Sequence, residues 1–183
     1  MRVVLLLLIV FIAGCGTPCV APPPPPNEQS LVNEVRNKTF AQLKEEKELY
    51  PYGIGSEMMY QIKMLALGFR YYKEVNIAQA RELLIRAGTV FLDTINSNEQ
   101  IRQFLHNYPF KPENIEISIY LQKPDGSNPD PDKLTVITIT NGVLDYMIDE
   151  PGTYRLLTIY KETFEEATEK LNTDEGIAAL KTL

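Results

Sequence analysis

The residues LTVITITNGVLDYMI, positions 134–148, decide the fold that this sequence predicts. Two apolar-rich runs flank Asn141-Gly142, and this dipeptide is the strongest short-range signal for a two-residue hairpin turn. Such a turn pairs Thr140 with Val143, Ile139 with Leu144 and Ile137 with Tyr146. Because opposed residues share a face, the natural core side of the hairpin carries Ile137, Ile139, Leu144, Tyr146 and Ile148.

Two further strands extend this hairpin into a meander. Before it, Ile115–Leu121 alternates apolar and polar residues with the period of two that a half-buried strand requires. After it, Pro151-Gly152 predicts a turn into a fourth strand at Tyr154–Lys161. A capping box, Thr163 with Glu166, then predicts a last helix through about Leu171.

Apolar residues recur at helical spacing in the first half of the chain. Helices are predicted over 30–49 with a cap at Ser30, over about 56–69 with a cap at Ser56, over 77–96, and over 97–107. Blocks of helices and strands are typical of the α+β class. The predicted fold is one α+β domain, residues 28–172, with N-terminal helices followed by a four-stranded antiparallel meander and a C-terminal helix; residues 173–183 are expected to form a loose tail.

The second face of the predicted sheet is more apolar than a solvated face needs to be. The turn register places Val136 and Met147 on it, and Leu156 joins them if Leu157 and Ile159 point to the core. We predict that part of this face binds a partner or ligand, and the candidate residues are Tyr120, Val136, Met147, Tyr154, Leu156 and Tyr160. The alternative is that the helix over 30–49 or the one over 163–171 covers this face.

Residues 1–14 have the form of a secretory signal peptide. Arg2 precedes the apolar run Val3–Ile12, which is shorter than the ~20 residues of a membrane-spanning helix and is followed by small residues. The segment Ile12–Cys15 resembles the lipobox of bacterial lipoproteins, although that motif usually has Leu where Ile12 stands. The resemblance implies cleavage before Cys15, acylation of Cys15 and, because Gly16 follows rather than Asp, the outer membrane more than the inner one. An ordinary signal peptide that leaves Cys15 free is the alternative.

Residues 15–27 are expected to be a tether that follows the acylated cysteine. Pro18 and the run Pro22–Pro26 favour an extended polyproline II conformation, which makes a stiff spacer between membrane and domain. The proline run is less readily interpreted as a ligand for a partner. Acylation of Cys15 would leave Cys19 as an unpaired thiol, either passive or able to pair between molecules, and no disulfide could hold the domain.

Residues 76–167 resemble a group of predicted secreted or lipid-anchored proteins of intracellular bacteria. The resemblance is carried by 80–84, 95–99, 108–110 with 114–117, the Asn141-Gly142 hairpin, and 162–167. It covers about half of the chain. It implies a common domain but no catalytic residues.

The composition excludes some classes of partner and site. The chain has 183 residues and a net charge of −6, which disfavours nucleic acid and gives no polybasic contact with anionic lipid. His106 is the single histidine, so a histidine-rich zinc site is excluded. Gly53–Ser56 lacks the strand and the third glycine of a dinucleotide site.

Two clusters of acidic residues are better explained by local structure than by a metal site or a catalytic site. Asp125, Asp130 and Asp132 crowd one loop, without the closing glutamate of a calcium-binding loop. Glutamates 162, 165, 166 and 169 lie at a capped helix start, where the helix dipole favours acids. We therefore predict no catalytic residue, no metal site and no cofactor.

The predicted function is that of a membrane-anchored lipoprotein that presents an acidic α+β interaction or structural domain outside the cytoplasm, in the cell envelope. The alternative is a small-ligand-binding module with a pocket between helices and sheet. A hydrolase that uses paired carboxylates is a third interpretation. A deep cavity with converging polar groups would favour the ligand, and a flat exposed apolar patch would favour the partner.

Overall fold

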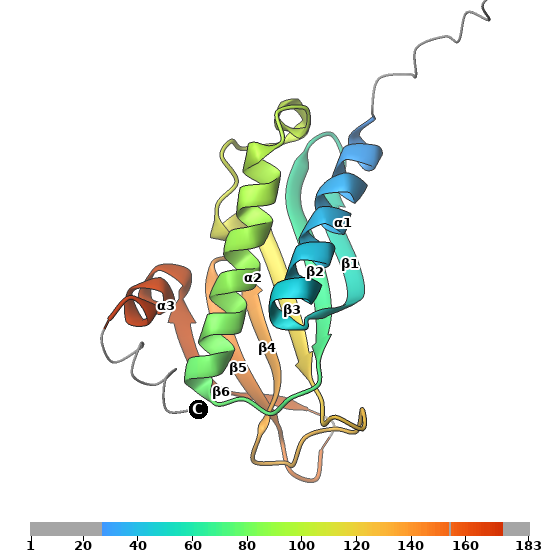
Figure 1. Cartoon of the computed structure of the whole chain (residues 1–183). Coiled ribbons are helices and arrows are strands. Elements are labelled where there is room, and N and C mark those ends of the chain that lie inside the picture. Colours follow the sequence, from blue (N-terminus) through green and yellow to red (C-terminus); the bar gives the residue numbers. More distant parts are fainter. Residues whose placement is uncertain (1–26, 154, 174–183) are drawn as a thin grey trace, which may run out of the picture.

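The computed structural model describes residues 27–153 and 155–173. This part of the chain folds into a six-stranded mixed sheet with helices on one face (Figure 1). The strands follow one another across the sheet in sequence order. In chain order the elements are α1 (Glu28–Lys47), β1 (Tyr50–Met58), β2 (Ile62–Tyr71), α2 (Ile77–Ser97), two 3-10 turns (Ile101–Phe104 and Pro112–Asn114), β3 (Ile115–Leu121), β4 (Leu134–Thr140), β5 (Val143–Asp149), β6 (Leu156–Thr163) and α3 (Phe164–Leu171).

The predicted helix over 56–69 is wrong, because this segment and the residues before it form the β1–β2 hairpin. Leu65, Leu67 and Phe69 alternate along β2 and are fully buried, which is the period of a half-buried strand. Gly68 lies opposite Gly53 of β1. A Cβ at Gly68 would approach the Gly53 backbone nitrogen to 3.3 Å, so the glycines here permit close strand pairing.

The predicted fold, with its four-stranded antiparallel meander, is therefore corrected to an α+β fold with a six-stranded mixed sheet. β2 pairs with β3 in parallel, and a parallel pair needs a crossover connection, which α2 supplies. The neighbours from β3 to β6 pair antiparallel. The added β1–β2 hairpin extends the sheet beyond β3 and turns part of the expected helical layer into strand.

The predicted β4–β5 register is confirmed. Thr140 pairs with Val143, Ile139 with Leu144, and Ile137 with Tyr146. Asn141 and Gly142 have φ values of 51° and 74°, as the two central residues of a type I′ turn require.

Side-chain caps fix the helix starts. Asn27, and not the predicted Ser30, caps α1, because its side chain accepts a hydrogen bond from the Ser30 backbone N–H. The capping box of Thr163 with Glu166 is confirmed at α3. The helix predicted over 97–107 is only the 3-10 turn at 101–104, where Asn98 accepts from the backbone N–H groups of Gln100 and Ile101.

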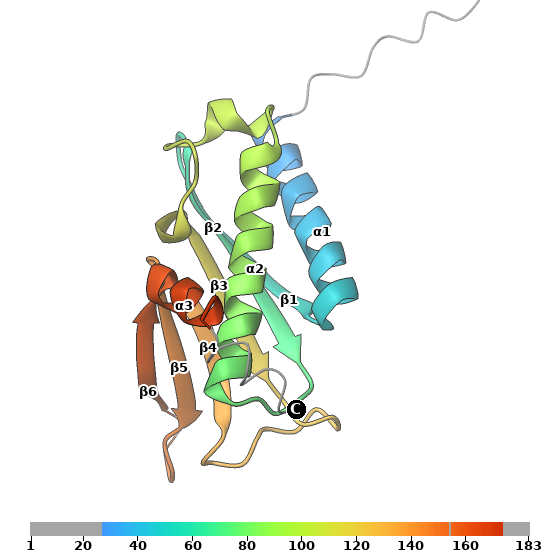
Figure 2. The same ribbon diagram turned by 60° about the vertical axis from the view of Figure 1, so that its left-hand side comes forward.

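The three helices of the described chain lie on the same face of the sheet, and the hydrophobic core lies between the two layers (Figures 1 and 2). α2 crosses the middle of the sheet, with α1 beside it over β1 and β2, and α3 beside it over β5 and β6. Phe164 of α3 packs against α2 at Gly88, where a Cβ would lie 2.7 Å from the ring. None of the helices described in residues 27–173 combines the length and the apolar character needed to cross a bilayer.

Candidate functional site

The opposite face of the sheet is open, since no described helix lies on it. Because paired residues share a face, one row across five strands can be followed from the register. It runs through Arg70, Tyr120, Val136, Met147 and Thr158. The predicted cover by the helices over 30–49 or 163–171 is therefore absent from this face in the described chain, and the row faces outward.

Four tyrosines and an arginine gather at the β1–β3 end of this row, and we call them the tyrosine cluster: Tyr50, Tyr52, Arg70, Tyr72 and Tyr120. The rings of Tyr52 and Tyr120 meet edge to face with centroids 5.2 Å apart. The rings of Tyr50 and Tyr72 do so at 5.4 Å. Tyr52 is 53% exposed and Tyr120 is 38% exposed, so the cluster offers aromatic surface to the solvent.

Arg70 joins the two aromatic pairs. Its guanidinium carbon lies 4.1 Å from the centroid of the Tyr52 ring, a cation–π geometry, and it is paired across the strands with Tyr50 and Tyr120. Hydrogen bonding with Tyr52, and then with Tyr72, raises the pKa of Arg70 above its ordinary value. Beside the cluster is a groove of about 320 Å³ lined by Glu48, Tyr50, Tyr71, Tyr72, Lys73 and Pro124.

The predicted interaction residues do not all lie together. Tyr120 and Met147 lie in the open row, and Leu156 lies on the same face, opposite Asp149, where it is 48% exposed. Val136 is in the row too, but its neighbours bury it to 6% exposure. Cys15 and Tyr154 lie outside the described residues.

Tyr160 is on the other face, which corrects its assignment to the open surface. A β-bulge shifts the pairing, since Tyr146 is opposite Tyr160 whereas the next residue, Met147, is opposite Thr158. The extra residue, Ile159, reverses the alternation along β6. Tyr160 consequently faces the helices, where its ring lies beside that of Tyr146.

A buried ionic cluster under α3 surrounds Glu162, which lies in β6 and not on the predicted acidic helix. One carboxylate oxygen accepts from Arg81 Nε at 2.7 Å and from the Tyr146 hydroxyl at 2.6 Å. The other oxygen accepts from Lys170 Nζ at 2.8 Å. These contacts join α2, β5, β6 and α3.

The charges in this cluster compensate one another. Burial raises the pKa of Glu162, but the hydrogen bonds from Arg81, Lys170 and Tyr146 outweigh it and leave the pKa below its usual range. Burial, with the bond to Glu162, raises the pKa of Tyr146. Because both oxygens of Glu162 already accept bonds from the protein, the arrangement is that of a clamp between elements.

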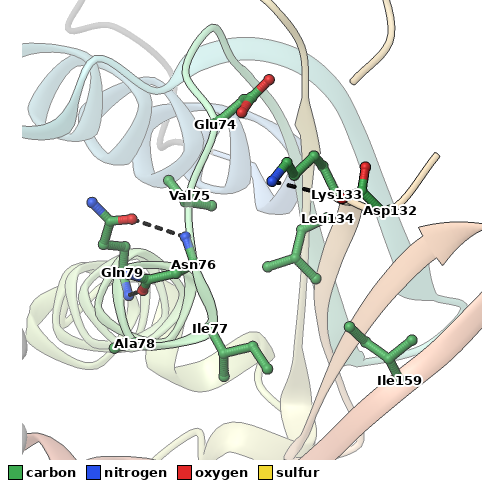
Figure 3. Close-up of a pocket in the computed structure, with 10 residues that line it drawn as sticks. All are labelled: Glu74, Val75, Asn76, Ile77, Ala78, Gln79, Asp132, Lys133, Leu134 and Ile159. Carbon is green, nitrogen blue, oxygen red and sulfur yellow. Dashed lines mark hydrogen bonds and ion pairs between the residues drawn. The ribbon is translucent and has the colours of Figure 1, made fainter. Parts of the chain in front are cut away.

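A pocket of about 640 Å³ opens where the start of α2 meets β4 and β6. Ile77, Leu134 and Ile159 give it an apolar lining, and Glu74, Asp132 and Lys133 also line it, as Figure 3 shows. Asn76 and Gln79 close a capping box at the helix start, so their side chains already bond to backbone N–H groups. This pocket lies between helix and sheet, the position expected for a small ligand.

Other residues considered from the sequence have local partners. His106 is exposed, and its Nδ1 lies 2.9 Å from the side-chain oxygen of Gln61. Asp125 accepts from the backbone and hydroxyl of Ser127, and Asp130 pairs with Lys123. No group of three or more potential metal ligands occurs within residues 27–153 and 155–173.

The sequence interpretation missed Tyr50, Tyr52 and Arg70, which flank the segment 56–69 that was assigned to a helix. The alternation of Tyr50 and Tyr52 is a strand signal, but a register shift between Pro51 and Gly53 places Ile54 opposite the buried Leu67, so alternation alone does not reveal which face the tyrosines share. With this geometry established, the chain was compared with known proteins. It matches no protein-family profile, no curated protein and no solved structure.

Proposed function

We propose that the chain is a lipid-anchored protein of the cell envelope whose domain binds a protein partner through the open face of its sheet. The observation that carries this proposal is the open face of the sheet, on which Tyr120 and Leu156 are exposed, with the tyrosine cluster at its end. Exposed apolar and aromatic side chains that gather on an uncovered face mark a site of interaction. Tyrosine and arginine are also the residue types most enriched at the energetic centres of protein interfaces.

The anchor is supported by sequence alone. The segment Ile12–Cys15 carries the lipobox-like pattern, and the proline-rich residues that follow suit a spacer. An acyl chain contributes ~0.8 kcal/mol for each buried CH₂, and more than one chain is needed for a stable anchor.

The experiment is a pull-down from envelope extracts with Met147→Asp as the test variant. Met147 is half-buried in the open row, so a carboxylate there should remove the partner and leave the thermal unfolding midpoint near that of the wild type. The matched control is Asn37→Asp, which adds the same charge to an exposed position on α1. A loss of stability above ~2 kcal/mol, as for a buried unpaired charge, would assign Met147 to the core and refute the proposal.

The pocket at the start of α2 carries a second candidate function, the binding of a small apolar ligand. Its volume of about 640 Å³ is within the ~300–1,000 Å³ that small-molecule sites occupy. Ala78→Phe would fill the pocket, and a ligand that stabilises the wild type in thermal unfolding should then lose its effect. The partner function is preferred because most polar residues of this pocket already have partners: Asn76 and Gln79 bond in the capping box, and Asp132 pairs with Lys133.

A further inference from the structure

The tyrosine cluster has the chemistry of a surface that recognises polyproline II helices. Such helices dock on grooves lined by aromatic rings, and here two edge-to-face pairs, at 5.2 Å and 5.4 Å, lie side by side across Arg70. A proline backbone offers carbonyl acceptors but no N–H donors. The tyrosine hydroxyls and Arg70 provide the donors that such a backbone needs, whereas Lys73 in the adjacent groove is already paired with Glu48.

The chain itself contains such a ligand. Residues 22–26 are consecutive prolines, and residues 3–27 carry no charged side chain. A neutral segment avoids the repulsion that would oppose contact between two copies with a net charge of −6 each. We propose that the tyrosine cluster binds the proline run, residues 22–26, of a second copy of this chain; this rests on the proposed function of the open face as a docking surface.

The run cannot reach the cluster of its own copy. The run ends at Pro26, directly before Asn27, the cap of α1, and its five residues span at most ~18 Å when fully extended. The twenty residues of α1 are about 30 Å long, and Figure 1 shows the start of α1 at the opposite end of the molecule from the start of β1 and the end of β2, where the cluster lies. Arg70 and Tyr120 also lie on the face of the sheet away from α1, although Lys44 Nζ of α1 lies 5.7 Å from the centroid of the Tyr50 ring.

This geometry suits a closed pair of copies. The start of α1, to which the run is joined, and the cluster lie at opposite ends of one molecule, so two copies that run in opposite directions bring the start of α1 of each copy to the end that carries the other's cluster. An exchange of this kind is isologous and closes as a dimer. Anchoring in one membrane would further raise the effective concentration of each run near its neighbour.

The test uses the chain from residue 15 onwards, with Cys15→Ser and Cys19→Ser to exclude acylation and disulfide pairing. A labelled peptide of residues 17–27, also with Cys19→Ser, is titrated against it and followed by fluorescence anisotropy. We expect Tyr52→Ala to weaken binding by about tenfold or more, as for a residue at the centre of an interface. The matched control is Tyr60→Ala, at the 92% exposed tip of the β1–β2 hairpin, which should bind as the wild type does.

Sedimentation then tests whether the proline run binds to a second copy of the chain and so forms a dimer. The wild type should form a concentration-dependent dimer, and the dimer should be lost when residues 22–26 become Gly-Ser repeats or when Tyr52 is alanine. Absence of peptide binding, or equal binding by Tyr52→Ala, would overturn the inference. So would peptide binding by a chain that stays monomeric, since the occupant would then be the proline-rich segment of another protein. Partner loss in Met147→Asp, combined with no peptide binding, would leave the proposed function standing and remove this inference alone.

Discussion

Gly142 is the residue on which the β4–β5 turn depends. Its φ of 74° lies in the left-handed region, where a β-branched side chain is strained. We expect Gly142→Val to lower the free energy of unfolding by ~1–3 kcal/mol, the usual range for such strain, as measured by urea denaturation. Thr140→Val, which places the same side chain one residue before the turn, is the control, and a neutral Gly142→Val would contradict the turn assignment.

Glu162 is a residue whose charge stabilises the fold. Its carboxylate is buried and bonded to Arg81, Lys170 and Tyr146, so Glu162→Gln should cost ~1.5–3 kcal/mol, the range for a hydrogen bond to a charged group. Because its pKa is lowered in the folded state, its contribution is complete above the unfolded pKa of about 4.3. This stabilising contribution of Glu162 is lost as the pH falls through the pKa that the carboxyl group has in the folded state.

The pH dependence separates this charge effect from a loss of packing. Between neutral pH and the acid limb, the wild type should lose more stability than Glu162→Gln, since the variant has no carboxylate to protonate. Glu169→Gln, an exposed position on α3, should follow the wild-type curve. Parallel curves for wild type and Glu162→Gln would show that Glu162 does not have a lowered pKa.

At the scale of elements, α2 and α3 pack against each other at Gly88. A Cβ there would lie 2.7 Å from the Phe164 ring and 3.0 Å from Ile139 Cδ1. Gly88→Val should therefore destabilise by ~1–3 kcal/mol through overpacking, although valine is a better helix former than glycine. Thr89→Val, at the next position of α2, is the control; a Gly88→Val variant as stable as the wild type in thermal unfolding would show that α3 does not pack there.

The strands and helices differ in how well the sequence could predict them. The Asn141-Gly142 turn and the alternation around it determine the β4–β5 pairing directly, because the turn length fixes the register. The β1–β2 segment was ambiguous, since Leu65 and Phe69 satisfy both a period of two and a spacing of four. Leu67 satisfies only the strand period, and Gly68 is unfavourable in a helix, so these two residues carried the correct signal.

Strand alternation and strand pairing also explain which residues of the candidate site could be predicted from the sequence. Tyr120 and Met147 were placed on the open face because their strands alternate regularly up to the hairpin. Tyr160 was misplaced because the bulge at Ile159 depends on how β5 and β6 pair, and no local pattern marks it. Tyr52 and Arg70 come together from two strands, so their contact could not be inferred before the β1–β2 hairpin was known.

At the scale of the whole molecule, anchor and domain are expected to be independent. The elements run from Glu28 to Leu171, and the core between helices and sheet draws its residues from within that range. Cys15→Ser should therefore abolish labelling of the chain by a fatty-acid analogue and release it from the membrane fraction. It should leave the thermal unfolding midpoint unchanged, because no described core contact involves residue 15.

Cys19→Ser is the matched control for this experiment. It removes the other cysteine of the chain and leaves the lipobox-like segment Ile12–Cys15 intact, so labelling and membrane association should persist. Equal labelling of the wild type and Cys15→Ser, or labelling of neither, would refute acylation at Cys15. A lowered unfolding midpoint in Cys15→Ser would show instead that the segment before Asn27 stabilises the domain, since an anchor with no contact to the core has no means of doing so.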